Sequence, residues 1–426
     1  MSKRFWIKAG GLALVLAVAA AALVAWLNVR GEEPIPAQAP ALQPTPQLLA
    51  RGAYLARAGN CAACHTQRGG TPYAGGKGID TPFGTVFAPN LTPDPATGVG
   101  NWSAAEFWRA MHHGRSKDGR LLYPAFPYPD YTLVTREDSD ALYAYLRSVP
   151  AVQQQNRPHD LRFPYNAQAS LAVWRALFFS PGQFTPEETK SAEWNRGAYL
   201  ARGLGHCQAC HAPRNAFGAT NSDLELSGGL IPMQNWYAPS LASTSEAGVQ
   251  DWSAQEVVQL LKSGRSARGT AMGPMSEVVF SSTQHLNQED LNAMATFLRE
   301  LPRHDSARVD GQRASSEFLG LGQRIYKNQC AQCHGDNGEG GGAIYPALKG
   351  HRTVTMNSSA NLVRVIISGG FPPTTAGQPR PFGMPPFGQS LSETEIAAVA
   401  SYVRSAWGND AGAVQPFDVQ KLRSMQ

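Results

Sequence analysis

All six cysteines of the 426-residue chain occur in one short pattern. The pattern reads Cys-x-x-Cys-His and appears three times, as CAACH, CQACH and CAQCH. It is the attachment site of c-type haem, in which both thiols form thioethers and the adjacent histidine binds the iron. The sequence therefore predicts three covalently bound c-type haems. Their candidate ligands are the cysteines Cys61, Cys64, Cys207, Cys210, Cys330 and Cys333, and the histidines His65, His211 and His334.

Other uses of paired cysteines fit this pattern less well. A disulfide framework suits an exported chain but gives no reason for a histidine after every second cysteine. A thioredoxin-like redox site needs one such motif between a strand and a helix. A structural zinc site needs two motifs brought together to supply four ligands. Three complete motifs favour haem attachment over all three alternatives.

Each haem motif belongs to a longer repeat. The segments GAYLARAGNCAACHT and GAYLARGLGHCQACHAP are near copies, and GQRIYKNQCAQCHG is a looser third. In the first two repeats, NWSAAEFWRAMHHG and DWSAQEVVQLLKSG also match. Ser103 and Ser253 are followed three residues later by Glu106 and Glu256, which predicts a capping box at the start of each helix.

Each repeat closes with an amphipathic segment in which apolar residues recur at three- and four-residue spacing, which predicts a helix. We place the repeats at residues 47–155, 191–304 and 315–410 and expect a mostly α protein. Units of about 100 residues have small cores, and a covalently held porphyrin would supply part of the missing apolar surface.

The N-terminus carries an uncharged apolar run from Ala9 to Val29 behind Lys3, Arg4 and Lys8. Its length predicts a membrane-spanning helix within residues 1–30, and the flanking positive charges place the rest of the chain outside the cytoplasm. A cleaved signal peptide is the alternative, although Pro40 directly follows its best cleavage motif, at 37–39.

Three further segments lie outside the repeats. Residues 31–46 are rich in proline and predict a semi-extended tether that holds the globular part off the membrane. Residues 156–190 form an aromatic-rich connector, which could pack between the first two repeats, dock a partner subunit or rest on the membrane. Residues 411–426 are expected to be a tail. The net charge of +5 shows no basic stripe, so nucleic acid is not an expected partner.

A single repeat resembles a class I cytochrome c domain. From about Leu48 to Trp407, and with the segments SAEWNRGAYL, GHCQACHAPRN and STQHL, the chain resembles the three-haem cytochrome c subunits of membrane-bound bacterial alcohol, gluconate and aldehyde dehydrogenases. The resemblance implies a mostly α fold of three tandem class I cytochrome c domains behind an N-terminal transmembrane helix.

The resemblance also implies a methionine as the sixth iron ligand, late in each repeat. Met384 in PFGMPPFGQ and Met275 in GPMSEVV match this position, with Met272 as a nearby competitor. In the first repeat the alignment needs one extra residue and then brings Phe126 onto Met275. Phenylalanine has no lone pair for iron, so the first site differs from the other two.

Three outcomes remain open for the first site. The iron could be five-coordinate beneath an apolar ring. It could recruit His112 or His113, or Met111 from the same helix. Alternatively, the two histidines are a solvated helix end whose positive charge suits the helix dipole.

In cytochromes c that resemble this chain, a loop proline carbonyl accepts a hydrogen bond from the proximal histidine. Pro89, Pro239 and Pro346 match that role by order and spacing. Such a bond orients the ligand and tunes its basicity. The alternative is that these prolines only stiffen their loops.

All the recognisable chemistry is iron ligation, so we expect an electron-transfer subunit and not an enzyme on its own. The resemblance implies a periplasmic catalytic subunit as donor, of quinoprotein, flavoprotein or molybdenum type. It implies ubiquinone in the bacterial inner membrane, or failing that a terminal oxidase of the respiratory chain, as acceptor. Two other functions remain: a peroxidase-like or gas-binding role for an open first haem, and a free-standing electron shuttle.

Overall fold

A computed structural model describes residues 3–36, 42–221, 224–304, 311–342 and 344–424. The chain forms two compact units. The first holds Met1–Leu55 and Cys64–Thr185, and the second holds Ala56–Ala63 and Pro186–Gln426. The possible cleavage motif at residues 37–39 lies outside the described residues.

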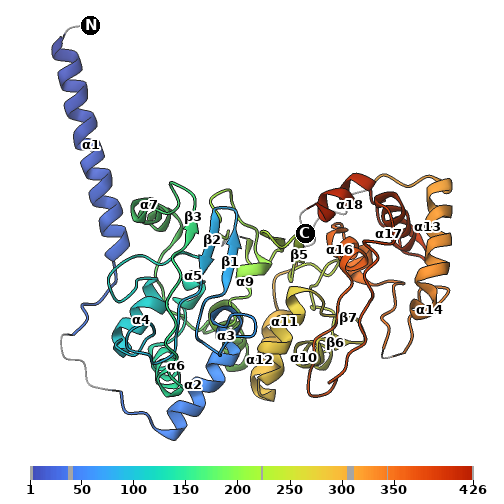
Figure 1. The fold of residues 1–426 in the computed structure, drawn as a ribbon, viewed down its shortest axis with the longest axis horizontal. Coiled ribbons are helices and arrows are strands. Elements are labelled where there is room, and N and C mark those ends of the chain that lie inside the picture. Colours follow the sequence, from blue (N-terminus) through green and yellow to red (C-terminus); the bar gives the residue numbers. More distant parts are fainter. Residues whose placement is uncertain (1–2, 37–41, 222–223, 305–310, 343, 425–426) are drawn as a thin grey trace. The chain divides into compact units, whose positions relative to one another are not determined.

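The first unit contains the N-terminal helix, most of the first repeat and the connector (Figure 1). Its helices are α1 (Lys3–Val29), α2 (Pro46–Ala58), α3 (Cys61–His65), α4 (Ala104–His113), α5 (Tyr128–Tyr131), α6 (Arg136–Ser148) and α7 (Gln168–Phe178). The boundary between the units falls within α2 and α3. Strands β1 (Gly78–Thr81), β2 (Gly84–Phe87) and β3 (Asp160–Leu161) form an antiparallel sheet in that order.

The second unit contains the second and third repeats. The second repeat has α8 (Ala192–Ala198), the π-helix η1 (Tyr199–Leu204), α9 (Gln208–His211), α10 (Ala254–Ser263), α11 (Pro274–Ser281), the 3₁₀ helix η3 (Thr283–His285) and α12 (Gln288–Arg299). Its hairpins pair β4 (Gly229–Ile231) with β5 (Trp236–Ala238), and β6 (Arg265–Ser266) with β7 (Gly269–Thr270). The third repeat has α13 (Ser316–Gln329), α14 (Ala331–His334), α15 (Arg352–Thr355), α16 (Ala360–Ser368) and α17 (Glu393–Ser405), followed by α18 (Pro416–Arg423).

The first and last helices of every repeat cross at a glycine. The crossing pairs are α2 with α6, α8 with α12, and α13 with α17. At each glycine, an added Cβ would overlap a backbone carbonyl oxygen of the partner helix. The glycines and the residues whose carbonyls they contact are Gly52 and Ala141, Gly197 and Ala293, and Gly322 and Ala398. The helix backbones are therefore as close as two helices can come, and the sequence repeat corresponds to a repeated packing geometry.

An ion pair flanks this crossing in the first two repeats. Arg51 Nε bonds Asp138 Oδ1 at 2.7 Å, and Arg196 Nε bonds Asp290 Oδ1 at 2.7 Å. Both aspartates are buried and lie in the first turn of the closing helix. The third repeat has Leu321 in the place of the arginine.

The two predicted capping boxes are confirmed. Ser103 and Ser253 accept hydrogen bonds from the backbone of Glu106 and Glu256, whose side chains bond back to the serine N–H groups. Both helices end at a glycine in the left-handed region, a conformation that favours glycine.

The segment 411–426 is not the tail that the sequence analysis expects. Residues Pro416–Arg423 form α18, which packs on α17. Val414 and Val419 are fully buried in the core of the third repeat, and Arg423 forms an ion pair with Glu393. The partly buried Leu422 also packs on this core, and three apolar residues are too few for a pattern that predicts the contact.

The connector packs on the first unit. Its strand β3 pairs with β2, and its helix α7 ends at Phe179, which stacks edge-on against the buried Tyr128. Arg175 of α7 is buried, and its guanidinium lies 5.1 Å from the centre of the Tyr128 ring.

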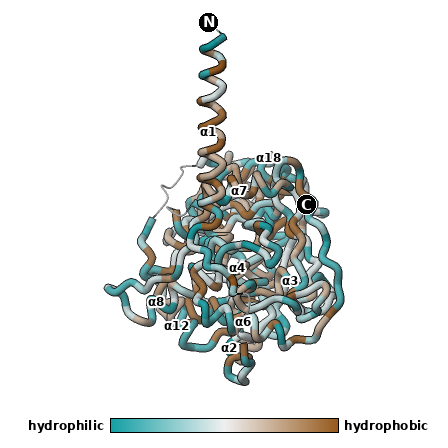
Figure 2. The backbone as a smooth tube through the Cα atoms, turned by 90° about the vertical axis from the view of Figure 1, so that its left-hand side faces the viewer, coloured by the Kyte–Doolittle hydropathy of each residue, from teal (hydrophilic) through white to brown (hydrophobic). Residues whose placement is uncertain are grey.

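The base of α1 is fixed to the same unit. Asn28 is buried and donates from Nδ2 to the carbonyl of Ala172, while Arg175 Nε donates to Asn28 Oδ1, both at 2.9 Å. Arg115 donates to the carbonyl of Asn28 and also pairs with Glu32. Figure 2 shows the brown, hydrophobic α1 ending beside α7. The proline-rich segment 31–46 therefore does not set the distance between α1 and the first unit, contrary to the expectation of a tether.

Substituting Gly322 by alanine should destabilise the chain, because its Cβ would overlap the Ala398 carbonyl at the helix crossing. Overpacking of this kind costs about 1–3 kcal/mol. Gly320 is the matched control on the same helix, since a Cβ there meets only the end of the Arg324 side chain, at 3.8 Å. Gly320→Ala should be neutral or stabilise by up to about 1 kcal/mol through helix propensity. Chemical unfolding followed by circular dichroism measures both, and equal midpoints for the two variants would contradict the close crossing.

Candidate haem sites

Each Cys-x-x-Cys-His motif lies at the end of the first helix of its repeat, on the short helix α3, α9 or α14 or just before it. Helical residues three and four positions apart share a face. The two cysteines and the histidine of one motif are therefore presented together. None of the six cysteines, all of them among the described residues, forms a disulfide in the structure. This arrangement fits attachment of one porphyrin edge at two points with the histidine beneath the ring.

The proximal histidines all contact the prolines that the sequence analysis singles out. In each repeat the histidine Nδ1 lies within hydrogen-bonding distance of the proline carbonyl oxygen. The distances are 2.8 Å for His65 and Pro89, 2.8 Å for His211 and Pro239, and 2.9 Å for His334 and Pro346.

This contact determines the chemistry of the imidazole. A carbonyl oxygen can only accept a hydrogen bond, so Nδ1 carries the proton and Nε2 keeps its lone pair. Burial also lowers the pKa of His65, His211 and His334, which favours the neutral ring. A neutral imidazole with Nε2 available is the form that binds iron, and its partner at Nδ1 fixes its orientation.

The surroundings of the motifs also fit a haem. The residues of the short helices α3, α9 and α14 are at most partly buried, so their histidines are desolvated but not enclosed on every side. In the third repeat, Cys330 and Met384 both pack against the same apolar core. That core also includes residues of α16, whose Arg364 has Nε and Nη1 atoms that are buried and unpaired among the described residues. A haem supplies both an apolar ring and carboxylates, which suits these groups.

The predicted sixth ligands lie on defined elements. Met275 is in the first turn of α11, directly after Pro274. Met384 lies in a loop whose backbone pairs with Gly370, with Met384 N–H donating at 2.8 Å and Gly370 N–H donating at 3.0 Å. Methionine sulfur as sixth ligand raises the reduction potential of the iron.

The structure supports the alignment that replaces Met275 by Phe126. Leu122 N–H donates to the carbonyl of Gly114, and Ala271 N–H donates to the carbonyl of Gly264, the equivalent helix C-cap. Counting four residues from Leu122 gives Phe126, and four from Ala271 gives Met275. The extra residue of the first repeat therefore falls earlier, between Arg115 and Leu121.

His112 has a packing role at the end of α4. One ring nitrogen bonds the backbone of Thr132, and the ring stacks on Trp108 at 4.3 Å. Lys262 occupies the equivalent place in the second repeat and likewise donates to a backbone carbonyl, that of Leu286, at 2.8 Å. His112 is buried, with Nδ1 unpaired among the described residues.

His113 and Met111 are also buried. Burial, followed by the positive charges of Arg175, Arg115 and Arg109, lowers the pKa of His113 to about 4. Burial and the neighbouring His113 lower the pKa of His112 to the same value. The expectation of a solvated, charged helix end at these two histidines is therefore wrong, because both rings are enclosed and neutral at pH 7.

Comparison with known proteins identifies the family. The cytochrome c family profile matches residues 49–150 and 320–407, within the first and third repeats. The chain is 40% identical over 394 residues to the cytochrome c subunit of the quinone alcohol dehydrogenase of Gluconacetobacter polyoxogenes, covering 88% of this chain and 84% of that protein. The chain belongs to the cytochrome c subunits of dehydrogenase complexes.

Two further relatives have other substrates in their names. The chain is 37% identical to the gluconate 2-dehydrogenase cytochrome c subunit of Pantoea cypripedii, over 88% of this chain and 89% of that protein. It is 34% identical to the fructose dehydrogenase cytochrome subunit of Gluconobacter japonicus, over 94% of this chain and 87% of that protein. Members of this family are the electron-transfer subunits of their complexes and not the catalytic subunits, which confirms the expectation of electron transfer.

Sequence reasoning did not single out Arg364. The available signal was a lone charge within the apolar helix segment NLVRVIIS. A single arginine in such a helix is ambiguous without the fold, because it can equally reach solvent.

We expect reduced, haem-loaded protein to bind carbon monoxide at about one haem in three, since Phe126, which has no lone pair for iron, stands where Met275 stands in the second repeat. Phe126→Met should abolish this binding by supplying a thioether where Met275 stands in the second repeat. A carbon monoxide difference spectrum with haem quantification measures both.

Met275→Ala is the matched control, and it should open a second haem to the gas. Absence of carbon monoxide binding in the unaltered protein would show that the first iron already has a sixth ligand. In that case gas binding gained by His112→Ala, His113→Ala or Met111→Ala would identify it.

Proposed function

We propose that this chain is a membrane-anchored cytochrome c with three haems, one in each of three tandem class I cytochrome c domains. It carries electrons from a periplasmic dehydrogenase subunit to ubiquinone. The observation that carries the proposal is the threefold occurrence of a haem motif whose histidine bonds a proline carbonyl. Each such site provides one iron ligand in the correct tautomer.

The membrane assignment is supported by α1. This helix is long and apolar enough to cross a bilayer, and its side chains are largely exposed along the apolar stretch. Lys3, Arg4 and Lys8 lie at its N-terminal end, which favours a cytoplasmic start and a periplasmic globular part. An uncleaved anchor would hold the haem sites beside a lipid-soluble acceptor.

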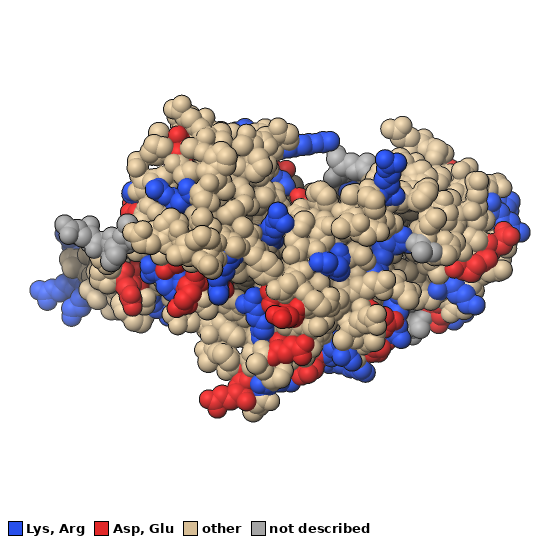
Figure 3. All heavy atoms as spheres, turned by 90° about the horizontal axis from the view of Figure 1, so that it is seen from below, with Lys and Arg blue, Asp and Glu red and all other residues tan. Residues whose placement is uncertain are grey.

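The donor belongs to a complex of the kind that the relatives' names describe. Alcohol, gluconate and fructose dehydrogenases all appear among them, so the family fits a donor that oxidises an alcohol, an aldehyde or a sugar derivative. The cofactor of the catalytic subunit can be pyrroloquinoline quinone, flavin or molybdopterin. On the face that Figure 3 shows, basic and acidic side chains are interspersed.

Helix α7 supports contact with the membrane surface. Its Val173 and Leu177 lie four residues apart on one helical face, with exposed fractions of 47% and 68%. The neighbouring Asn28 contact fixes α7 to the base of α1, where an apolar face would reach the lipid headgroups. The connector then serves as an interfacial helix, one of the three roles that the sequence left open.

Oxidation by quinone tests the proposal directly. The full-length holo-protein is incorporated into lipid nanodiscs, reduced with dithionite, freed of excess reductant and mixed with decylubiquinone. We expect the haem absorption band of the reduced state to decay. Ferricyanide is the control oxidant. Reoxidation by ferricyanide but not by the quinone would rule out the quinone route.

Adding candidate substrates to native membranes would identify the donor. Addition of ethanol, acetaldehyde or gluconate should reduce the haem bands when the matching dehydrogenase subunit is bound. Reduction by none of these substrates would contradict the proposed donor class.

A spin label at Leu177 should report lipid contact by α7. After haem attachment all native thiols are thioethers, so Leu177→Cys would provide the single free thiol. In nanodiscs we expect greater exposure of this label to dissolved oxygen than to a water-soluble relaxation agent. Ser148→Cys, at the exposed end of α6, is the control and should show the reverse. Identical profiles at the two positions would contradict membrane contact.

A second function, gas or peroxide chemistry at the first haem, is favoured by one observation, the replacement of methionine by Phe126. It requires that the first iron stay open in the reduced protein, and the carbon monoxide measurement decides that point.

A further inference from the structure

The second and third repeats make a defined contact within the second unit. Asn361, at the start of α16, donates from Nδ2 to the carbonyl of Tyr237 at 2.7 Å. In return, the Tyr237 N–H donates to Asn361 Oδ1 at 2.9 Å. This reciprocal pair attaches helix α16 of the third repeat to strand β5 of the second.

Arg364 lies one turn further along α16 and faces the same strand. Its guanidinium is 5.6 Å from the centre of the Trp236 ring. The ring face attracts the positive charge, but it offers no acceptor for the N–H groups in the guanidinium plane. Arg364 Nε and Nη1 are buried and unpaired among the described residues. A buried guanidinium without an acceptor is unfavourable, so these two groups need a carboxylate or a similar partner.

Trp236 connects this arginine to the sixth-ligand segment of the second repeat. A Cβ added at Gly273 would lie 2.7 Å from Trp236 ring atoms, so the ring packs directly on the glycine backbone. Gly273 precedes Met275 by two residues and caps α11. The indole therefore lies between Arg364 and the segment that carries Met275.

The sixth-ligand segments also touch each other directly. Ser276 Oγ donates to the carbonyl of Phe371 at 3.2 Å. The methyl carbon of Met272 lies 3.3 Å from the position that a Cβ would take at Gly370. Gly370 is the backbone partner of Met384. The segments that carry Met275 and Met384 thus meet across the contact between the repeats.

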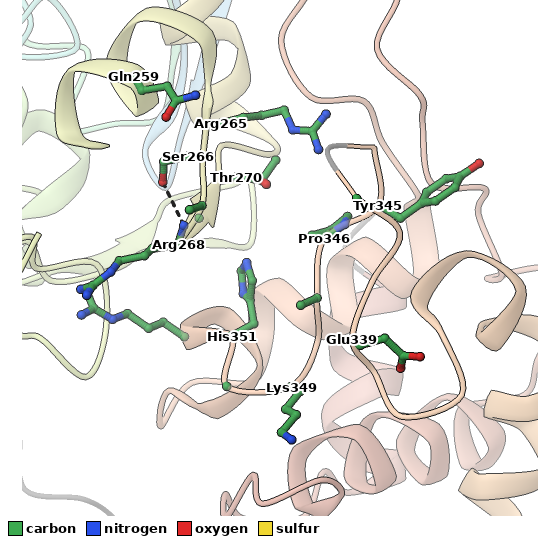
Figure 4. Close-up of a pocket in the computed structure, with 16 residues that line it drawn as sticks. Gln259, Arg265, Ser266, Arg268, Thr270, Glu339, Tyr345, Pro346, Lys349 and His351 are labelled. Carbon is green, nitrogen blue, oxygen red and sulfur yellow. Dashed lines mark hydrogen bonds between the residues drawn. The ribbon is translucent and has the colours of Figure 1, made fainter. Parts of the chain in front are cut away.

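The same two repeats also share a cavity that Pro346 lines. It has a volume of about 640 Å³ and is lined by Pro346 of the third repeat and by the β6–β7 hairpin of the second. Figure 4 shows Arg265 and His351 extending toward it from the two sides. An ion pair between Arg352 and Asp251, at 2.8 Å, holds its edge. The second repeat therefore also borders Pro346, the partner of His334.

We propose that Arg364 binds a propionate carboxylate of the third haem and that Arg364 and Trp236 form the direct electron-transfer contact between the third and second haem sites. The inference rests on the proposed function, since it requires haem at both sites. One electron leaves a ferrous iron, which becomes ferric, and reduces a ferric iron at the neighbouring site. No proton or further reactant takes part.

The arginine has two effects in this arrangement. Its planar guanidinium matches a carboxylate with two parallel hydrogen bonds, which fixes the position of the haem edge. Its positive charge, partly buried in the protein, favours the ferrous iron over the more positive ferric iron. Removal of that charge should therefore lower the reduction potential of the third haem.

A redox titration of the full-length holo-protein tests this. Arg364→Gln should lower one of the three potentials by at least 59 mV, which corresponds to a tenfold change in a one-electron equilibrium. Arg364→Lys keeps the charge, so the affected reduction potential should stay close to that of the unaltered protein. Arg324→Gln removes the same charge from the exposed face of α13 and should leave all three potentials unchanged. Unchanged potentials in Arg364→Gln, or an equal shift in Arg324→Gln, would overturn the assignment.

Electron paramagnetic resonance tests the contact in protein that keeps both Arg364 and Trp236. Two ferric haems that are close accelerate each other's spin relaxation. When the second haem is ferric and the third is reduced, we expect the electron-spin relaxation of the second haem to be slower than when both haems are ferric. Met275→His marks the signal of the second site by its altered g values. Relaxation that is independent of the third site would refute the contact, while oxidation by quinone would still test the proposed function separately.

Discussion

Every repeat depends on a helix crossing with no space for a β-carbon. At Gly52, Gly197 and Gly322 the backbone of the first helix lies against a carbonyl of the last. The first helix leads directly into the haem motif, and the predicted sixth-ligand positions precede the last helix. The crossing therefore fixes the distance between these two parts of each repeat, and a residue larger than glycine at the crossing would increase it.

The second constraint is electrostatic. A proline carbonyl holds the proton of each proximal imidazole at Nδ1 and so leaves Nε2 for the metal. Proline suits this role because it has no N–H of its own and fixes the loop backbone. The three repeats differ mainly at the predicted sixth-ligand positions, which hold Phe126, Met275 and Met384. Differences in potential among the sites should arise there and from partly buried charges such as Arg364.

Much of this organisation could be predicted from local sequence. The haem motifs, the capping boxes at Ser103 and Ser253, and the order of the prolines depend on short fixed spacings, and the structure has each in its expected place. The glycines of the helix crossings could not be recognised, because a glycine in a helix has no local signature of what it touches.

Long-range contacts were the least predictable. Helix α18 packs through Val419 and the partly buried Leu422, with Val414 just before it, too few apolar residues for a periodic pattern. His112 looked like a solvated helix end because it precedes a glycine, yet Trp108 and Thr132 enclose it. The pairing of Asn361 with Tyr237 joins residues 124 positions apart, and nothing near either residue indicates it.

The attachment of α1 through Asn28 and Arg175 changes the meaning of the proline-rich segment. Because α1 and the start of α2 belong to the same unit, residues 31–46 link two elements of that unit and not two separate bodies. The entropic cost of joining two fixed ends grows slowly with the length of the connecting chain, by about 0.6 kcal/mol for each doubling. A change in the length of this segment should therefore alter the free energy of unfolding of the first unit only slightly.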